Sequence, residues 1–133
     1  MLARRNGRAT GLKVSWRLGD LLEPLRGRKV DLLVSNPPYL SVLEYDELDI
    51  SVKEWEPASA LIGGPTGLEP YQRLFAAGST AMNPGGWIAV EIDARRADET
   101  ARIATDNEWR DVRVYDDLFG RPRYLQARWE DRE

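Results

Sequence analysis

Apolar and polar residues alternate along several short stretches of the chain, and this two-residue period is typical of half-buried strands. At 13–18, for example, Val14, Trp16 and Leu18 fall on one face. Two other stretches are mostly apolar runs of the kind found in strands buried on both faces. The predicted strands are 13–18, 30–35, 87–92, a segment around Val112 and Val114, and 124–129.

Apolar residues at helical spacing predict helices between these strands. The predicted helices are 2–10, a short one near 44–54, 68–82 and 94–109. Strands that alternate with helices indicate an α/β fold with a mainly parallel sheet, and the last two strands, joined by a short loop, suggest an antiparallel pair. The rest of 40–67 is acidic and irregular, and such long connections are often functional.

The composition fits one compact domain of 133 residues with 42% hydrophobic side chains. The chain contains no cysteine and no histidine, which excludes disulfides, thiol nucleophiles, histidine acid–base catalysis and the usual zinc ligands, so we expect no metal. No apolar run approaches the ~20 residues of a membrane span, and the first residues lack the apolar core of a secretory signal. We therefore expect a cytoplasmic protein that does not bind membranes.

The net charge of −3 is unevenly distributed along the chain. Residues 1–30 carry eight basic side chains, whereas 31–69 carry eight acidic ones against Lys53 alone. A basic start is compatible with nucleic-acid binding, but the acidic total favours a solvated surface, so nucleic acid is the less favoured partner, except through a ribosome-associated substrate.

The most informative motif is Asn36-Pro37-Pro38-Tyr39, which follows the apolar run 30–35. Ligands of open α/β sheets bind at the carboxyl ends of strands. The Asn36 carboxamide offers an acceptor and two donors in one plane, which complements another amide or a base edge with an NH2 group. The prolines fix the backbone in an extended form that leaves carbonyls free to accept, and the Tyr39 ring stacks on planar groups. The structural alternative is a proline-stiffened turn with an asparagine cap.

These residue types suit methyl transfer to an NH2 group on an sp2 carbon. Its nitrogen lone pair is delocalised, and two acceptors that hold its hydrogens favour a pyramidal nitrogen aimed at the methyl group. The product is cationic and sheds a proton readily, so positioning and electrostatics replace a tuned base. This chemistry agrees with the absence of histidine.

The motif resembles the signature of amino-methyltransferases that act on adenine in nucleic acids or on glutamine in peptide chain release factors. The wider pattern resembles the release-factor family, the protein-(glutamine-N5) methyltransferases. The matching segments, in the family's order, are Gly19–Leu25, Val34–Tyr39, Glu56–Leu61, Gly63–Leu68, Tyr71, Asn83–Trp87, Glu91–Ile92 and Asp117–Arg121.

The resemblance implies S-adenosylmethionine as cofactor and a release factor as partner. Asn36 and the Pro37 carbonyl would hold the glutamine amide, with Pro38 and Tyr39 packed beside it. Asp20, the Leu21 backbone and Asn36 would contact the cofactor, although Asp20 is equally compatible with a plain turn. Glu91 would face the site, remain solvated or pair with an arginine.

The resemblance also implies a Rossmann-like class I methyltransferase fold with strand order 3-2-1-4-5-7-6. No strand and glycine-rich turn of the cofactor-binding kind precedes Asn36, so 1–133 is expected to be a partial catalytic domain. It would lack the first two strands, the glycine-rich loop and the family's N-terminal helical domain. The strand 13–18 would then pair with 30–35, or an uncovered sheet edge would promote self-association.

Two sequence departures bear on the pocket: Thr66 replaces a usual aspartate, and Asp93-Ala94-Arg95-Arg96 replaces a stretch richer in glycine and glutamine. Two other functions remain open at this point. One is an adenine-N6 methyltransferase of DNA or RNA, against which the acidic 31–69 argues. The other is a catalytically inert fragment or a binding module.

Overall fold

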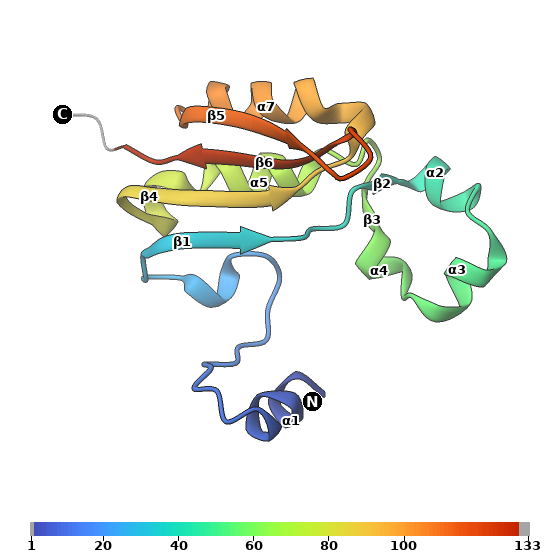
Figure 1. The fold of residues 1–133 in the computed structure, drawn as a ribbon, viewed down its shortest axis with the longest axis horizontal. Coiled ribbons are helices and arrows are strands. Elements are labelled where there is room, and N and C mark those ends of the chain that lie inside the picture. The colour runs from blue at the N-terminus through green and yellow to red at the C-terminus, as the bar shows by residue number, and fades with distance from the viewer. Residues whose placement is uncertain (1, 131–133) are drawn as a thin grey trace.

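A four-stranded mixed sheet forms the centre of the computed structural model, which describes residues 2–130 apart from the side chain of Ser79 (Figure 1). Its strands lie in the order β1-β4-β6-β5. β1 pairs in parallel with β4, whereas β4–β6 and β5–β6 are antiparallel. The strands are β1 (Val30–Ser35), β4 (Met82–Glu91), β5 (Arg110–Asp116) and β6 (Pro122–Arg128).

Two amphipathic helices, α5 (Glu69–Ala76) and α7 (Ala97–Asp106), lie behind the sheet in Figure 1 and cover one of its faces. Their apolar stripes explain this position, because a helix with one apolar face is stable only when that face is buried. Tyr71, Leu74 and Phe75 of α5 are buried in the core with Ile88 and Leu125 of the sheet.

Aromatic rings pack together at the C-terminal ends of these two helices and complete the core there. Trp109 packs edge-on against Phe75 and Trp129, with ring centroids 5.8 and 5.4 Å apart, and its indole N–H donates to the Phe75 carbonyl oxygen at 2.9 Å. A Cβ at Gly78 would lie only 2.5 Å from the Trp129 ring, so glycine is required there. Aromatic pairs of this kind contribute about 1 kcal/mol beyond area burial.

Shorter elements complete the chain. They are α1 (Leu2–Ala9), the 3-10 turn η1 (Glu23–Leu25), β2 (Leu40–Ser41), α2 (Val42–Asp46), α3 (Ile50–Trp55), α4 (Ala58–Leu61), β3 (Ile62–Gly64), α6 (Gly78–Ala81) and the 3-10 turn η2 (Ala94–Arg96). β2 and β3 form a separate parallel pair. The segment 42–61, which we call the arm, projects beyond the carboxyl end of β1 and carries α2, α3 and α4 (Figure 1).

The α/β class, the antiparallel C-terminal pair and four of the predicted strands are confirmed. The main sheet is mixed rather than mainly parallel, because β6 runs antiparallel to both of its neighbours. The predicted helix 68–82 is divided between α5 and α6 at Ala77, and the single helix expected near 44–54 is two helices.

The predicted strand 13–18 is wrong, because the segment is irregular and every residue in it is exposed. The observed order β1-β4-β6-β5 corresponds to the last four positions, 4-5-7-6, of the order implied by the resemblance. In that order the strand at 13–18 would be third, and its partner would be a second strand that residues 2–130 do not contain. Alternation of side chains does not make a strand without a neighbour to pair with.

β1 is consequently an edge strand, and neither 13–18 nor any other described segment pairs with its outer edge. On the sheet face opposite the helices, the β1 side chains of Leu32 and Val34 are 60% and 74% exposed, and Trp87 lies beside Leu32 on β4. An apolar edge strand of this kind is a template for association.

Replacing the buried indole should destabilise the fold. We expect Trp109→Phe to lower the free energy of unfolding by about 2 kcal/mol, because the variant loses a buried hydrogen bond and leaves a cavity. Urea denaturation followed by circular dichroism measures this change. The same substitution at the 85% exposed Trp55 is the control and should cost under about 0.5 kcal/mol. Equal costs at the two sites would contradict this account of the core.

The open β1 edge should make the isolated chain self-associate, as the sequence predicts. Val34→Lys places a charge on the edge and should shift the chain toward monomer in light scattering coupled to size exclusion. Leu18→Lys, at an exposed position outside the sheet, should leave the association unchanged. A monodisperse monomer before any substitution would refute the prediction.

Candidate functional site

Asn36 and Pro37 lie directly after the carboxyl end of β1. Pro37 is buried, whereas Asn36 is exposed, and no described residue hydrogen-bonds the Asn36 carboxamide. A cavity of about 420 Å³ opens in front of the motif Asn36–Tyr39, and all four motif residues line it. The asparagine is therefore neither a cap nor plugged by its own neighbours, and its donors and acceptor remain available to a ligand.

Two glycines of the next segment allow the motif backbone to be closely packed. A Cβ at Gly63 would lie 2.6 Å from the Pro38 carbonyl oxygen, and one at Gly67 would collide with the Tyr39 carbonyl. Gly67 also has a φ of +81°, which side chains rarely adopt. The segment Gly63–Leu68, one of those that match the family, thus contacts the motif directly, and its glycines provide close approach as well as turns. Thr66 closes this turn by donating to a Glu69 carboxylate oxygen at 2.9 Å.

Tyr39 is held between β1 and the end of β4. Its hydroxyl donates to Glu91 Oε1 at 3.4 Å, and burial, reinforced by the Glu91 charge, raises the pKa of the phenol. Tyr71 donates at 2.8 Å to the Glu91 backbone carbonyl, and Arg123 lies 3.7 Å from the Glu91 carboxylate. Glu91 therefore both borders the motif and pairs with an arginine, which were two of its expected roles.

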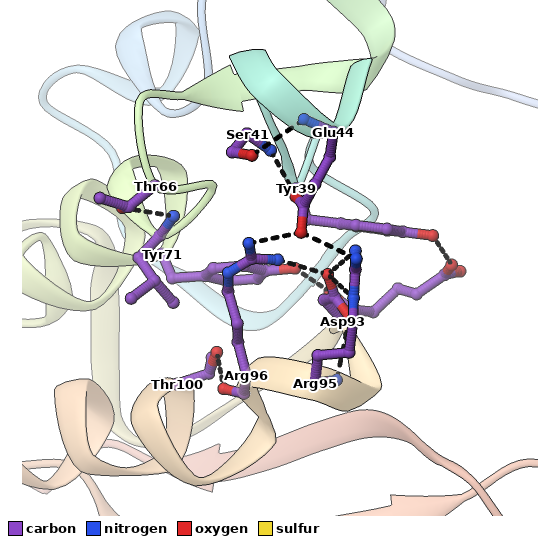
Figure 2. Close-up of polar contacts among 11 residues, drawn as sticks. Tyr39, Ser41, Glu44, Thr66, Tyr71, Asp93, Arg95, Arg96 and Thr100 are labelled. Atoms are coloured by element: carbon purple, nitrogen blue, oxygen red, sulfur yellow. Dashed lines mark hydrogen bonds and ion pairs between the residues drawn. The ribbon is translucent and has the colours of Figure 1, made fainter. Parts of the chain in front are cut away.

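A charged network ties the first turn of the arm to the loop after β4 (Figure 2). Glu44 accepts from the Ser41 backbone N–H at 2.8 Å in a capping box and from Arg96 at 2.7 Å. Arg96 also donates to Asp93 at 2.6 Å, and Arg95 pairs with both carboxylates.

The two carboxylates of this network are held in the ionised form. Burial alone would raise the pKa of Asp93, but hydrogen bonds from Arg95 outweigh it and lower that pKa. Burial opposes the same effect at Glu44, whose pKa is lowered by hydrogen bonds from Arg96 and Ser41. Charge-assisted bonds among partly buried groups are the stronger kind, so the network fixes the base of the arm beside Tyr39.

Sequence analysis missed this network. The capping pattern Ser41-x-x-Glu44 was a signal that could have been recognised. The pairing of Glu44 with Arg96, 52 positions later, is not indicated by any short sequence pattern.

Of the predicted cofactor residues Asp20, Leu21 and Asn36, only Leu21 lines a second hollow. Asp20 is exposed and forms an ion pair with Arg73 of α5 at 2.7 Å. Leu21 has a φ of +43° and lines an apolar hollow of about 320 Å³ together with Leu22, Leu33 and Ser35. The two hollows share no lining residue, but Ser35 of one and Asn36 of the other are consecutive at the carboxyl end of β1. Asp20 and Leu21 do not line the cavity in front of Asn36.

Within the described residues, no group of histidine, cysteine or carboxylate side chains could hold a metal ion. The helices of residues 2–130 are also too short or too polar to cross a bilayer.

Comparison with known proteins gives one consistent group of relatives. The release factor glutamine methyltransferase of Geobacter sulfurreducens is 41% identical over 97 residues, which cover 73% of this chain and 34% of that protein. Those of Bacteroides thetaiotaomicron and Koribacter versatilis are 34% and 36% identical over 95% and 96% of this chain, and 46% and 45% of their own lengths. No protein-family model matches the chain.

A solved structure agrees with these sequences. The protein-(glutamine-N5) methyltransferase (release factor-specific) from Alicyclobacillus acidocaldarius superposes with a TM-score of 0.50 at 26% identity. The match covers 80% of this chain and 52% of that one. The chain thus spans less than half the length of the first curated relatives and about half of the solved one. By sequence and fold together, the chain belongs to the family of release factor glutamine methyltransferases.

Proposed function

We propose that this protein takes part in transferring a methyl group from S-adenosylmethionine to the side-chain amide nitrogen of a glutamine in a peptide chain release factor. The observation that carries the proposal is the Asn36 carboxamide, which has no protein partner among residues 2–130 and faces a cavity at the carboxyl end of β1. The names of the relatives support the choice of substrate. The cytoplasmic location expected from the sequence stays a prediction.

In this proposal the motif holds the reacting nitrogen in place. The Asn36 side-chain oxygen and the Pro37 carbonyl oxygen accept the two hydrogens of the substrate amide, and the Asn36 NH2 donates to the substrate carbonyl. Held in this way, the nitrogen would direct its lone pair at the methyl group of the cofactor, and the new N–C bond would replace the C–S bond, whose electron pair would stay on sulfur. The alkylated nitrogen releases one proton to water, so no side chain here has to act as a strong base.

The cofactor would supply an electrophilic methyl group on a sulfonium centre. The apolar hollow lined by Leu21 would take the flat face of an adenine ring, and its lining ends at Ser35, the residue before Asn36, where the methyl group would be needed. Asp20 is exposed and precedes Leu21, which lines this hollow. To bind the ligand, its carboxylate would have to give up its ion pair with Arg73. These residues fit one end of the molecule, and we propose Asp20, Leu21 and Asn36 as its contacts.

The two other functions considered from the sequence are less well supported. The cavity in front of Asn36 is bordered by the acidic arm, which would repel the phosphates of DNA or RNA, and the names of the relatives described above specify release factors. An inert fragment would have no reason to keep an unpartnered carboxamide beside a cavity of about 420 Å³.

Removing the carboxamide should abolish methyl transfer. We expect Asn36→Ala to reduce incorporation of labelled methyl into a release factor at least about 100-fold, because preorganised hydrogen bonds at the reacting group are lost. Thermal unfolding should be unchanged, since Asn36 is exposed. Asn6→Ala, at an exposed position on α1, is the control. Full activity of Asn36→Ala would refute the role of Asn36, and incorporation into DNA but not the release factor would refute the substrate.

The ring of Tyr39, rather than its hydroxyl, should matter for substrate binding. Tyr39→Phe removes only a long hydrogen bond to Glu91, so we expect its KM to stay within about threefold of the original. Tyr39→Ala removes the surface that packs against the amide and should raise KM at least about tenfold. Steady-state kinetics with the release factor measure both values. A large loss in Tyr39→Phe would instead assign chemistry to the phenol.

A further inference from the structure

The arm forms one wall of the cavity in front of Asn36. Leu48, Val52, Ala60 and Leu61 of the arm line it opposite Pro38 and Leu40. Four of the five arm residues that line the cavity are apolar, and the fifth is Glu56, so the cavity can take an aliphatic or aromatic side chain next to the group held by Asn36. A single glutamine side chain would not use this surface.

The arm also exposes large apolar side chains that do not line the cavity. Leu43 and Ile50 are 75% and 71% exposed, and Trp55 is 85% exposed. Three such side chains on one short segment that also lines a cavity point to a site where another protein binds, because exposed apolar surface is otherwise unfavourable in water. Tryptophan in particular is enriched among residues that dominate binding energy.

The charge of the arm restricts what can bind there. Residues 42–61 carry six carboxylates and one lysine. The ammonium of Lys53 is already engaged inside the arm, where it donates to the Asp46 carbonyl at 2.8 Å and lies over the Tyr45 ring. Glu44 is neutralised by Arg95 and Arg96. The remaining carboxylates, Asp46, Glu47, Asp49, Glu54 and Glu56, are exposed and unmatched by nearby cations within the arm.

We propose that the arm is the docking surface for a positively charged segment of the protein substrate, one that carries an apolar side chain beside its glutamine. The lysines or arginines of that segment would face the exposed carboxylates. Its apolar side chain would enter the cavity and pack against Leu48 and Val52. The sign of the charge argues against nucleic acid, and the apolar wall argues against a purely polar ligand. This inference rests on the proposed function only in taking glutamine as the bound side chain.

The root of the arm suits this role. Ser41 and Glu44 cap α2, and Arg96 fastens Glu44 to the loop after β4 at 2.7 Å. A bound segment would therefore be placed at a fixed distance from Tyr39 and Asn36. Docking through a preorganised surface also spares part of the ordering cost of binding.

The test measures binding without the methyl donor, so it is independent of catalysis. The probes are a short glutamine peptide flanked by lysine, arginine and leucine, the same peptide with glutamate for each basic residue, and the basic peptide with serine for leucine. Fluorescence anisotropy of labelled peptide gives Kd at low and moderate salt. We expect the basic apolar peptide to bind at least about tenfold more tightly than either alternative, with the charge preference weakening as salt screens it.

Substitutions in the arm test whether the peptide binds there. Glu54→Lys should weaken the basic peptide about threefold to tenfold, and Trp55→Ala should weaken it by a similar factor. Asp106→Lys makes the same charge change at an exposed position on α7 and should leave Kd unchanged. Equal binding of basic and acidic peptides, binding of neither, or equal effects of Glu54→Lys and Asp106→Lys would overturn the inference. Methylation of a release factor despite such a result would leave the proposed function intact.

Discussion

The parallel register between β1 and β4 places Ser35 opposite Val90. Asn36 and Glu91, 55 positions apart in the sequence, consequently leave the sheet at the same edge. Each later feature of the site depends on this pairing: the Tyr39 hydroxyl reaches the Glu91 carboxylate, Tyr71 reaches the Glu91 carbonyl, and the loop after β4 brings Arg96 to Glu44. If β1 slipped by one residue, its side chains would change faces and these contacts would be lost together.

The two faces of the sheet differ in how far they are covered. One face is covered by α5 and α7 and closed by the Trp109 cluster, and it holds the buried core. On the other face Leu32, Val34 and Trp87 are exposed, and the outer edge of β1 has no partner among residues 2–130. The observed strand order equals four adjacent positions of the order implied by the family, which agrees with a match to about half of the solved relative.

Local patterns in the sequence predicted the elements whose stability depends on near neighbours. The strands at 30–35 and 87–92, the C-terminal strand pair and the helix α7 all follow their apolar periodicity. The strand predicted at 13–18 failed because its pattern was correct but its pairing partner was absent from the described chain. The helix at 68–82 was predicted as one element because its apolar stripe continues past Ala77, whereas the close approach of Gly78 to Trp129 belongs to the tertiary packing.

By itself, the sequence determined that the chain would be α/β, that Asn36–Tyr39 would follow a strand, and that no histidine or cysteine chemistry would be available. The expectation that this strand is buried on both faces was wrong, because β1 lies at the sheet edge and Leu32 and Val34 are exposed. These properties depend on residue type and on periodicity over a few positions, so they can be read locally. Only the tertiary structure decided that Glu44 meets Arg96, that Glu91 lies beside Tyr39, and that the arm forms a wall of the cavity. The first two contacts join residues 52 positions apart, and they exist because strand pairing and burial, rather than local propensity, set which distant side chains become neighbours.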